Sequence, residues 1–326
     1  MAVTDPRVLS LRAAGLGDLL TAVPALRAVS AAHPEARHVL ATSAGLQDLA
    51  PLVGGVDAVV TVAVGRDLVP PVESLDLAVN LHGCGPESHR MLLAAKPRRL
   101  VAFRRDDLAV PGPEWDPDEH EVRRWCRLVA AAGMPADPDD LDVSVSPGPL
   151  PHGVRGATVL HPGAGSPARQ WPIDRWTALA GAEAADGHRV VVTAGPGEWS
   201  LGAAIAAAVP GVDVVDCDHD IGLLLRVVAA ARVVVVGDTG VAHVATAVRT
   251  PSVVLFGPEP PSRWGPPEDR PWHVALWAGR RGDPHGVEPD AGLLELGVLD
   301  VLLAVRRVRA VYGALPGGVK VSSCAS

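Results

Sequence analysis

The stretch VVVGDTGVAHVA, residues 234–245, contains the transition that decides the fold of this chain. An apolar run typical of a buried strand ends at Gly237, a turn through Asp238, Thr239 and Gly240 follows, and a helical pattern begins at Val241. In open α/β sheets, ligands bind at strand ends of this kind. The unpaired N–H groups and the dipole of the following helix favour an anion, most often a phosphate.

Two side chains of this stretch can face one ligand. Thr239 and His243 are four residues apart, so they share a face of the predicted helix. In the alternative interpretation, Asp238 only caps the helix and His243 is a buried histidine with its hydrogen bonds satisfied. The rest of the chain is needed to choose between the two.

The composition predicts two packed α/β domains. The chain has 326 residues, of which 48% are hydrophobic and only 3% aromatic, and small aliphatic residues suit parallel strands buried on both faces. A formal charge of −8 argues against a nucleic-acid partner, because phosphate backbones require a basic surface. The four cysteines are scattered and form no Cys-x-x-Cys pair, so we expect neither a zinc site nor a disulfide framework.

No segment reads as a membrane or export signal. Residues 1–8 lack the apolar core of a signal peptide, and the longest apolar run, residues 223–236, is interrupted by Arg226 and Arg232. We therefore expect a cytoplasmic protein without a transmembrane segment, with peripheral contact at the inner membrane face left open.

Apolar runs alternate with helical stretches along the whole chain, which is typical of parallel sheets with crossover helices. In the first half, strands are predicted at 8–11, 39–42, 59–62, 77–81 and 100–103, and helices at 19–32 and 119–132. In the second half, strands are predicted at 158–161, 189–193, 212–215, 232–236 and 252–256, and helices at 174–185, 198–208, 221–231, 241–248 and 297–308.

A stretch rich in Pro, Asp and Gly, residues 135–156, separates the halves and is predicted to be a linker with one short strand. We accordingly expect a first Rossmann-like domain at 1–150, a second at 151–315 and a flexible tail at 316–326. The carboxyl ends of both doubly wound sheets are expected to face a cleft, and the last helix can pack back on the first domain.

Chemistry-bearing residues follow several of the predicted strands. The first loop carries Gly15, Gly17 and Asp18, and Asp18 is either a first-turn carboxylate or a general base. The loop after residue 161 carries Ser166 and Arg169, a bidentate donor for phosphate.

Glu198 opens a later helix, where a carboxylate can accept hydrogen bonds from ribose hydroxyls. Neither glycine-rich loop has the spacing of a dinucleotide fingerprint or a Walker A motif, which disfavours a nicotinamide dehydrogenase.

Three segments together resemble glycosyltransferase family 9, the ADP-heptose:lipopolysaccharide heptosyltransferase-like proteins. They are LRAAGLGDLLTAVPAL at 11–26, HPGAGSPARQWPIDRW at 161–176 and GDTGVAHVATAVRTPSVVLFGP at 237–258. The resemblance extends over residues 7–308 in the family's order. It implies a GT-B fold and metal-independent, inverting sugar transfer from a nucleotide-diphospho-sugar, most simply ADP-heptose, to a hydroxyl of a glycan or small molecule, without a cofactor.

The resemblance also implies site residues. Asp18 matches the family's base, and Arg169 stands where heptosyltransferases commonly carry a lysine that neutralises the leaving diphosphate. The remaining donor-binding candidates are Gly17, Ser166, Glu198, Asp238, Thr239, Gly240 and His243.

Departures from the family pattern leave the acceptor open. Thr21 stands in place of a His-Thr pair after the first loop, and Ser166 stands where paired threonines are common. Two alternatives remain: an epimerase or hydrolase of GT-B shape, and a nucleotide-sugar-binding relative that no longer transfers.

Overall fold

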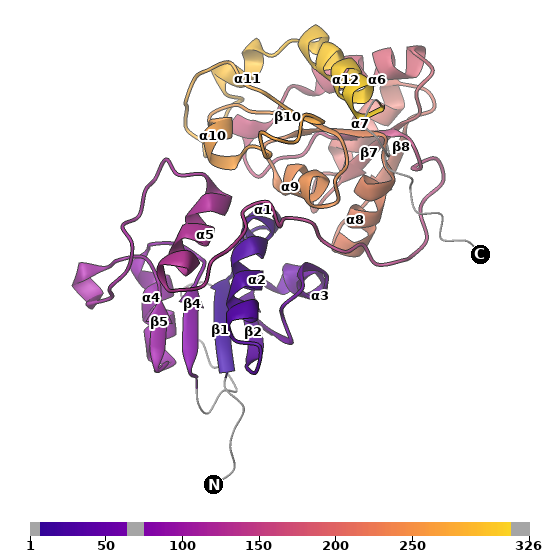
Figure 1. Cartoon of the computed structure of the whole chain (residues 1–326). Helices are drawn as coiled ribbons and strands as arrows, with labels where there is room; N and C mark the ends of the chain where they lie inside the picture. The colour runs from indigo at the N-terminus through magenta and orange to yellow at the C-terminus, as the bar shows by residue number, and fades with distance from the viewer. Residues whose placement is uncertain (1–6, 64–74, 314–326) are drawn as a thin grey trace. The chain divides into compact units, whose positions relative to one another are not determined.

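The computed structural model describes residues 7–63 and 75–313, which form two compact α/β units (Figure 1). The units are Met1–Ser144 and Val145–Ser326, referred to below as the first and second unit. Their boundary falls within the Pro/Asp/Gly-rich stretch at 135–156. The tail predicted at 316–326 lies outside the described residues.

The first unit is built on a parallel sheet with the strand order β3-β2-β1-β4-β5. Its buried, branched residues explain the strand formation, because a strand covered by helices on both faces has no polar face. The strands are β1 (Arg7–Arg12), β2 (Arg37–Thr42), β3 (Ala58–Thr61), β4 (Leu77–Asn80) and β5 (Arg99–Val101).

Helices cover both faces of this sheet. On one face α2 and α5 lie side by side (Figure 1), and on the other Leu9, Leu11, Val39 and Leu92 belong to one apolar core. The helices are α1 (Leu16–Thr21), α2 (Val23–Ala32), α3 (Ala50–Val53), α4 (Pro86–Ala94) and α5 (Glu121–Ala131), with short 3₁₀ turns at Ala44–Leu49 and Asp106–Leu108.

The helix predicted at 19–32 is two helices in the structure. Ala22 ends α1 and caps α2, and Pro24 stands in the first turn of α2. Proline has no N–H to continue the α1 hydrogen-bond ladder but is well tolerated at a helix start.

The second unit repeats this plan with one more strand. Its sheet has the order β11-β10-β9-β6-β7-β8, so its first and fourth strands, β6 and β9, are neighbours, as in a doubly wound nucleotide-binding sheet. The strands are β6 (Thr158–His161), β7 (Val190–Ala194), β8 (Asp213–Asp216), β9 (Val233–Gly237), β10 (Ser252–Leu255) and β11 (His273–Leu276).

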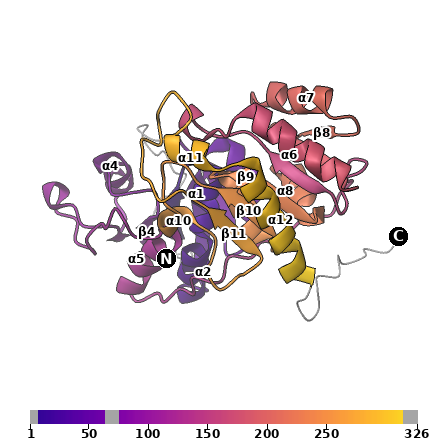
Figure 2. The same ribbon diagram turned by 90° about the horizontal axis from the view of Figure 1, so that it is seen from above.

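Alternating side chains of β9 pack against the helices on the two faces of the sheet. Val233 and Val235 join a core with α6, α7 and α12, whereas Val234 and Val236 point to the face covered by α9. The helices are α6 (Ile173–Ala185), α7 (Trp199–Ala208), α8 (Ile221–Ala230), α9 (Gly240–Ala247), α10 (Pro261–Trp264), α11 (Ala291–Glu295) and α12 (Val298–Gly313), with a 3₁₀ turn at Pro167–Arg169. Figure 2 shows α12 lying beside α6 and along β10 and β11.

Val301, Val305 and Val308 of α12 are buried in the second-unit core. Two expectations about other segments need correction. Residues 135–156 contain no strand, since prolines remove the donors that a ladder needs. The loop-rich segment after residue 258 contains β11, which pairs in parallel with β10.

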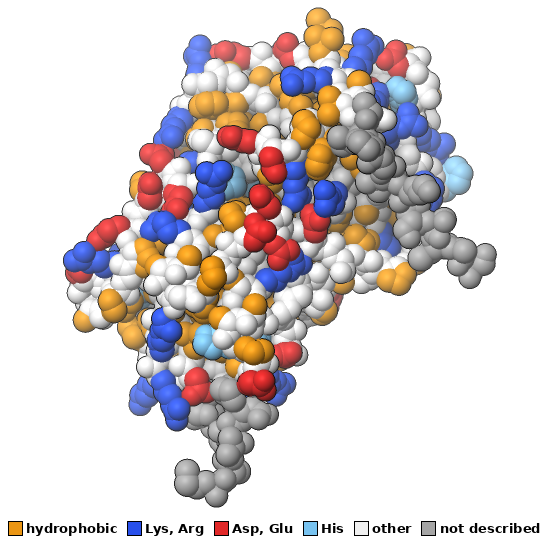
Figure 3. Space-filling view, viewed as in Figure 1, with side chains coloured by type: hydrophobic (Ala, Val, Ile, Leu, Met, Phe, Trp, Pro, Cys, Tyr) orange, Lys and Arg blue, Asp and Glu red, His pale blue; other side chains and the backbone are white. Residues whose placement is uncertain are grey.

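The exposed surface mixes both signs of charge. Acidic and basic side chains are interspersed on the face shown in Figure 3, in keeping with a modest net charge of −8. Among the described helices, none has the length and apolarity required to span a bilayer.

Candidate functional site

The candidate ligand site of the second unit lies at the carboxyl edge of its sheet. There the loops after β6 and β9 leave neighbouring strands, whose order reverses at this point. Such a switch point opens a crevice beyond the strand ends, which is the usual ligand position in doubly wound sheets. The loops carry Ser166 and Arg169 on one side and Asp238, Thr239 and Gly240 on the other.

Arg169 connects the two loops. Its Nη1 donates to the main-chain oxygen of Asp238 at 3.3 Å and lies 4.0 Å from the Asp238 carboxylate. Its Nε lies 3.5 Å from Ser166 Oγ, which itself donates to the carbonyl of Pro284 at 2.6 Å. The structure therefore brings together Ser166, Arg169 and Asp238, and it leaves guanidinium donors of Arg169 for a ligand.

The carboxyl group of Asp238 is largely removed from solvent. It is buried, and burial raises its pKa to about 6, with Glu259 adding to the shift and Arg169 opposing it. Desolvation disfavours the charged carboxylate of Asp238 more than the Arg169 guanidinium, 4.0 Å away, favours it. Asp238 therefore changes charge close to neutral pH.

This shift predicts a pH-dependent stability. Since the folded-state pKa of Asp238 is raised from 3.8, the protonated acid stabilises the fold, and this stability is lost as pH rises from about 4 through about 6. Compared with the wild type, Asp238→Asn should gain about 2 kcal/mol in free energy of unfolding between pH 4.5 and pH 8. Urea titrations at both pH values measure this gain.

Asp269→Asn is the matched control, because Asp269 is exposed in the same unit. We expect no pH-dependent gain for this variant. Equal gains for the two variants would show that burial at Asp238 is not the cause.

The N-terminus of α9 faces the same edge. Thr239, and not Asp238, is the N-cap residue, and it makes no side-chain cap hydrogen bond. Its Oγ1 is buried without a hydrogen-bond partner, which is costly unless a ligand supplies one. Gly240 begins the helix, and His243, one turn on, is partly exposed with its ring 5.9 Å from that of Trp264.

Glu198 lies in a second cluster, beyond β7. Its Oε2 accepts a hydrogen bond from the Gly195 N–H at 2.8 Å and lies 3.6 Å from Nε2 of His161. Gly163 is required beside it, because a Cβ there would overlap the Glu198 carboxylate. A hydroxyl-bearing ligand could donate a hydrogen bond to the part of this carboxylate that stays exposed.

His161 is a site residue whose role the sequence did not reveal. It is buried at the end of β6 with Nδ1 3.1 Å from Thr193 Oγ1. Burial lowers the pKa of His161, against the opposing charge of Glu198, so a neutral imidazole lies 3.6 Å from that carboxylate. A histidine that ends a buried strand was the available signal.

The first unit holds Asp18 at its own switch point, between β1 and β4. One carboxylate oxygen, Oδ1, accepts from Arg12 Nη2 at 3.0 Å, and Oδ2 accepts from the Gly15 N–H at 3.0 Å. The side chain is 34% exposed while that of Arg12 is 1% exposed. Asp18 is therefore held in one orientation with an open face. Gly17 is buried in α1, in a different unit from the other donor-binding candidates.

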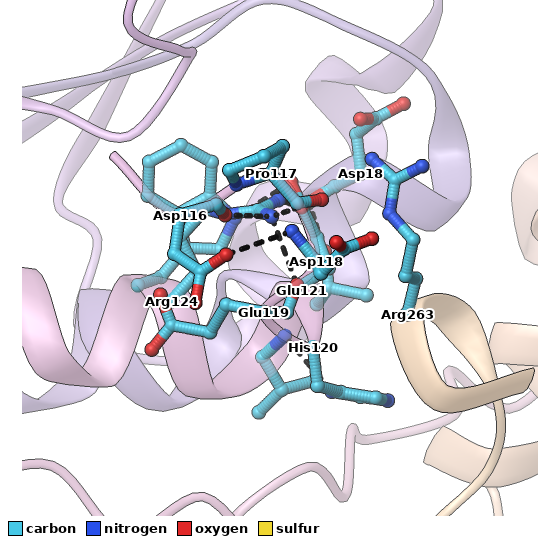
Figure 4. Close-up of polar contacts among 12 residues, drawn as sticks. Asp18, Asp116, Pro117, Asp118, Glu119, His120, Glu121, Arg124 and Arg263 are labelled. Carbon is cyan, nitrogen blue, oxygen red and sulfur yellow. Dashed lines mark hydrogen bonds and ion pairs between the residues drawn. The ribbon is translucent and has the colours of Figure 1, made fainter.

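A network of charges and aromatic rings lies behind Asp18. Glu121 of α5 accepts from Arg12 and Arg124, and Arg124 also donates to the main-chain oxygens of Asp116 and Glu119 (Figure 4). The guanidinium groups of Arg12 and Arg124 lie over the rings of Trp125 and Trp115. The sequence interpretation did not include this network.

Metal ligands are not gathered at either place. Among residues 7–63 and 75–313, no three His, Cys, Asp or Glu side chains form a group that could hold a metal ion. The positive charges that contact Asp18 and Asp238 come from Arg12 and Arg169.

Comparisons with known proteins agree with this arrangement. The model of the family "Glycosyltransferase family 9 (heptosyltransferase)" matches residues 107–283, a range that includes both site clusters of the second unit. Lipopolysaccharide heptosyltransferase 2 of Escherichia coli K12 is 29% identical over 126 residues, which is 36% of this chain and 36% of that relative. This chain therefore matches only about a third of that protein's length.

Two solved structures show the same fold over most of the chain. E. coli ADP-heptose lps heptosyltransferase II has a TM-score of 0.76 at 19% identity, covering 94% of this chain and 100% of that one. TibC, a dodecameric iron-containing glycosyltransferase of enterotoxigenic E. coli, has a TM-score of 0.61 at 15% identity, covering 94% of this chain and 76% of that one.

Proposed function

Because this chain belongs to glycosyltransferase family 9, we propose that it transfers a heptose from ADP-heptose to a hydroxyl of a glycan or small acceptor. The observation that carries the proposal is the hydrogen bond from Arg169 to the main chain of Asp238, at the start of α9. Beside this junction, the buried Thr239 hydroxyl has no hydrogen-bond partner. A diphosphate supplies what this junction lacks: negative charge and hydrogen-bond acceptors.

The donor is proposed to bind the second unit through three kinds of contact. Arg169 and the first N–H groups of α9, with Thr239 and Gly240, hold the diphosphate, and Ser166 fixes Arg169. Glu198 accepts hydrogen bonds from the ribose hydroxyls, as carboxylates near strand ends do in related sheets. Asp238 and His243 border the sugar. ADP is proposed as the nucleotide because the named relative with this fold uses ADP-heptose.

The reaction is proposed to be a direct displacement with inversion. Asp18 takes the proton of the acceptor hydroxyl while the oxygen of that hydroxyl attacks the anomeric carbon of the sugar. The bond from the anomeric carbon to the diphosphate oxygen breaks, and ADP is released. Arg169 stabilises the charge that develops on the departing diphosphate, as arginines do in phosphate sites. Gly17 lets the backbone approach the substrate beside Asp18.

We propose that the reaction requires no metal ion, because Arg169 provides the cationic charge that a divalent ion would otherwise provide. The likeness to an iron-containing glycosyltransferase makes this a point for experiment. The cytoplasmic location and a peripheral contact with the inner membrane face stay predictions, as does the identity of the acceptor.

The first test is calorimetric titration of the full chain with ADP, UDP, GDP and CDP, with and without EDTA. We expect ADP alone to bind with micromolar affinity, EDTA to leave it unchanged, and Glu198→Ala to weaken it by about tenfold, the loss of one charged hydrogen bond. Selective binding of another nucleotide would overturn the ADP assignment, and loss of binding in EDTA would overturn metal independence.

Transfer is then tested with ADP-heptose and a heptose-free lipopolysaccharide core. ADP release that requires the core supports a transferase, whereas equal release in water alone indicates a hydrolase. Appearance of an epimer of the sugar indicates an epimerase. Binding without turnover on any acceptor tried would indicate a non-catalytic relative.

A further inference from the structure

Arg12 occupies a central position behind Asp18. Its Nε donates to the Asp18 main-chain oxygen at 2.8 Å, its Nη1 to the Leu81 carbonyl at 2.7 Å, and its Nη2 to the Asp18 carboxylate. The same Nη2 donates to Glu121 Oε1 at 2.9 Å. One buried guanidinium thus joins the end of β1, the end of β4, α1 and α5.

Glu121 holds this guanidinium from the opposite side to Asp18. Its Oε1 also accepts from the Trp125 indole N–H at 3.0 Å, and its Oε2 pairs with Arg124. The four charged groups form an alternating chain, Asp18, Arg12, Glu121 and Arg124, in which every member except Asp18 is almost fully buried. A change of charge within this buried chain is therefore expected to act on Asp18, the one member that is open to solvent.

We propose that Glu121 is a positioning residue that acts through Arg12 to orient the Asp18 carboxylate and to limit the positive charge beside it. This inference rests on the proposed role of Asp18 as the base. With Glu121 present, Arg12 is shared between two carboxylates and Asp18 remains able to take up a proton. Without that negative charge, Arg12 pairs with Asp18 alone, and the charge of the buried Arg124 is no longer offset by Glu121. The excess positive charge opposes protonation of Asp18.

A further titratable group that interacts with Asp18 is His82, which follows β4. Burial lowers its pKa and the charge of Arg12 lowers it further, while Asp18 opposes the shift. His82 is therefore neutral near pH 7, so it does not replace the charge that is lost when Glu121 is changed to glutamine.

The test compares Glu121→Gln with Glu119→Gln in the full chain. Both remove one negative charge at the start of α5, but Glu119 pairs with Arg127 and not with Arg12. With ADP-heptose and the lipopolysaccharide core, we expect Glu121→Gln to lower kcat about tenfold and leave KM for ADP-heptose unchanged. The acidic limb of its pH–rate profile should move to lower pH by roughly half a unit or more. Glu119→Gln should do neither.

A double variant keeps the proposal testable if the single variant folds poorly. Glu121→Gln with Arg124→Gln removes one charge of each sign, so the acidic limb should return to its wild-type position while kcat stays low. The proposal would be overturned if the acidic limb of the pH–rate profile did not move in Glu121→Gln, or if that variant kept the wild-type kcat. ADP titration and circular dichroism establish that each variant is folded.

Failure of the proposed function gives a different result. If Asp18→Asn retains activity, Asp18 is not the base and the proposed mechanism fails. If Asp18→Asn is inactive but Glu121→Gln behaves like Glu119→Gln, only the role of Glu121 fails.

Discussion

Asp18→Asn is expected to lower kcat by about 10²–10⁴-fold, the usual contribution of a general base, with ADP affinity unchanged. Asparagine is nearly isosteric, and its side-chain oxygen can still accept from Gly15 or Arg12, so the local fold should persist. The amide cannot take the acceptor proton. Initial rates with ADP-heptose and the lipopolysaccharide core, together with ADP titration, measure both quantities.

Asp48→Asn provides the control for this prediction. Asp48 is exposed in the same unit, so its change to asparagine should alter kcat by less than twofold, a surface effect. An Asp18→Asn enzyme within threefold of the wild-type rate would refute the assignment of the base.

Arg169→Ala is expected to weaken ADP binding by about 30–100-fold, which corresponds to the loss of one or two charge-assisted hydrogen bonds. The guanidinium links the loops after β6 and β9 through Asp238. The variant therefore loses a hydrogen-bond donor to the diphosphate and the positive charge that offsets the charge of the diphosphate. Arg169→Lys should be intermediate, because it keeps the charge without the planar fork. Calorimetry with ADP gives the three affinities.

Arg307→Ala is the matched loss of one positive charge, since Arg307 is exposed on α12 of the same unit. Its ADP affinity should stay within twofold of wild type. Similar losses at Arg169 and Arg307 would indicate a general electrostatic effect and not a diphosphate site.

Much of the fold could be predicted because valine-rich runs alternate with helical stretches. The run that became β9 is apolar throughout, and a Gly-Asp-Thr turn ends it. β11 was missed because the four residues His273–Leu276 follow a proline-rich segment and carry no strong pattern. It forms because β10 offers it an edge, which is a tertiary effect.

The candidate site was predicted only in part, for a similar reason. Glycines and polar residues after strands marked the loops of Asp18, Arg169 and Glu198. The partners of these residues come from far along the chain: Glu121 contacts Arg12 across 109 positions, and His161 lies beside Glu198 from another strand. No local pattern encodes such pairs, so only the packed sheet reveals them.

The strand order of the first sheet recurs in the second, with one edge strand added. Asp18 and Arg169 therefore occupy corresponding positions, each in a short helical turn after the first strand of its unit. One framework, used twice, presents an acid in one copy and a cation in the other. In the proposed mechanism, the two halves of this chain therefore differ in chemistry through the side chains that follow equivalent strands, while the architecture that holds those side chains is the same.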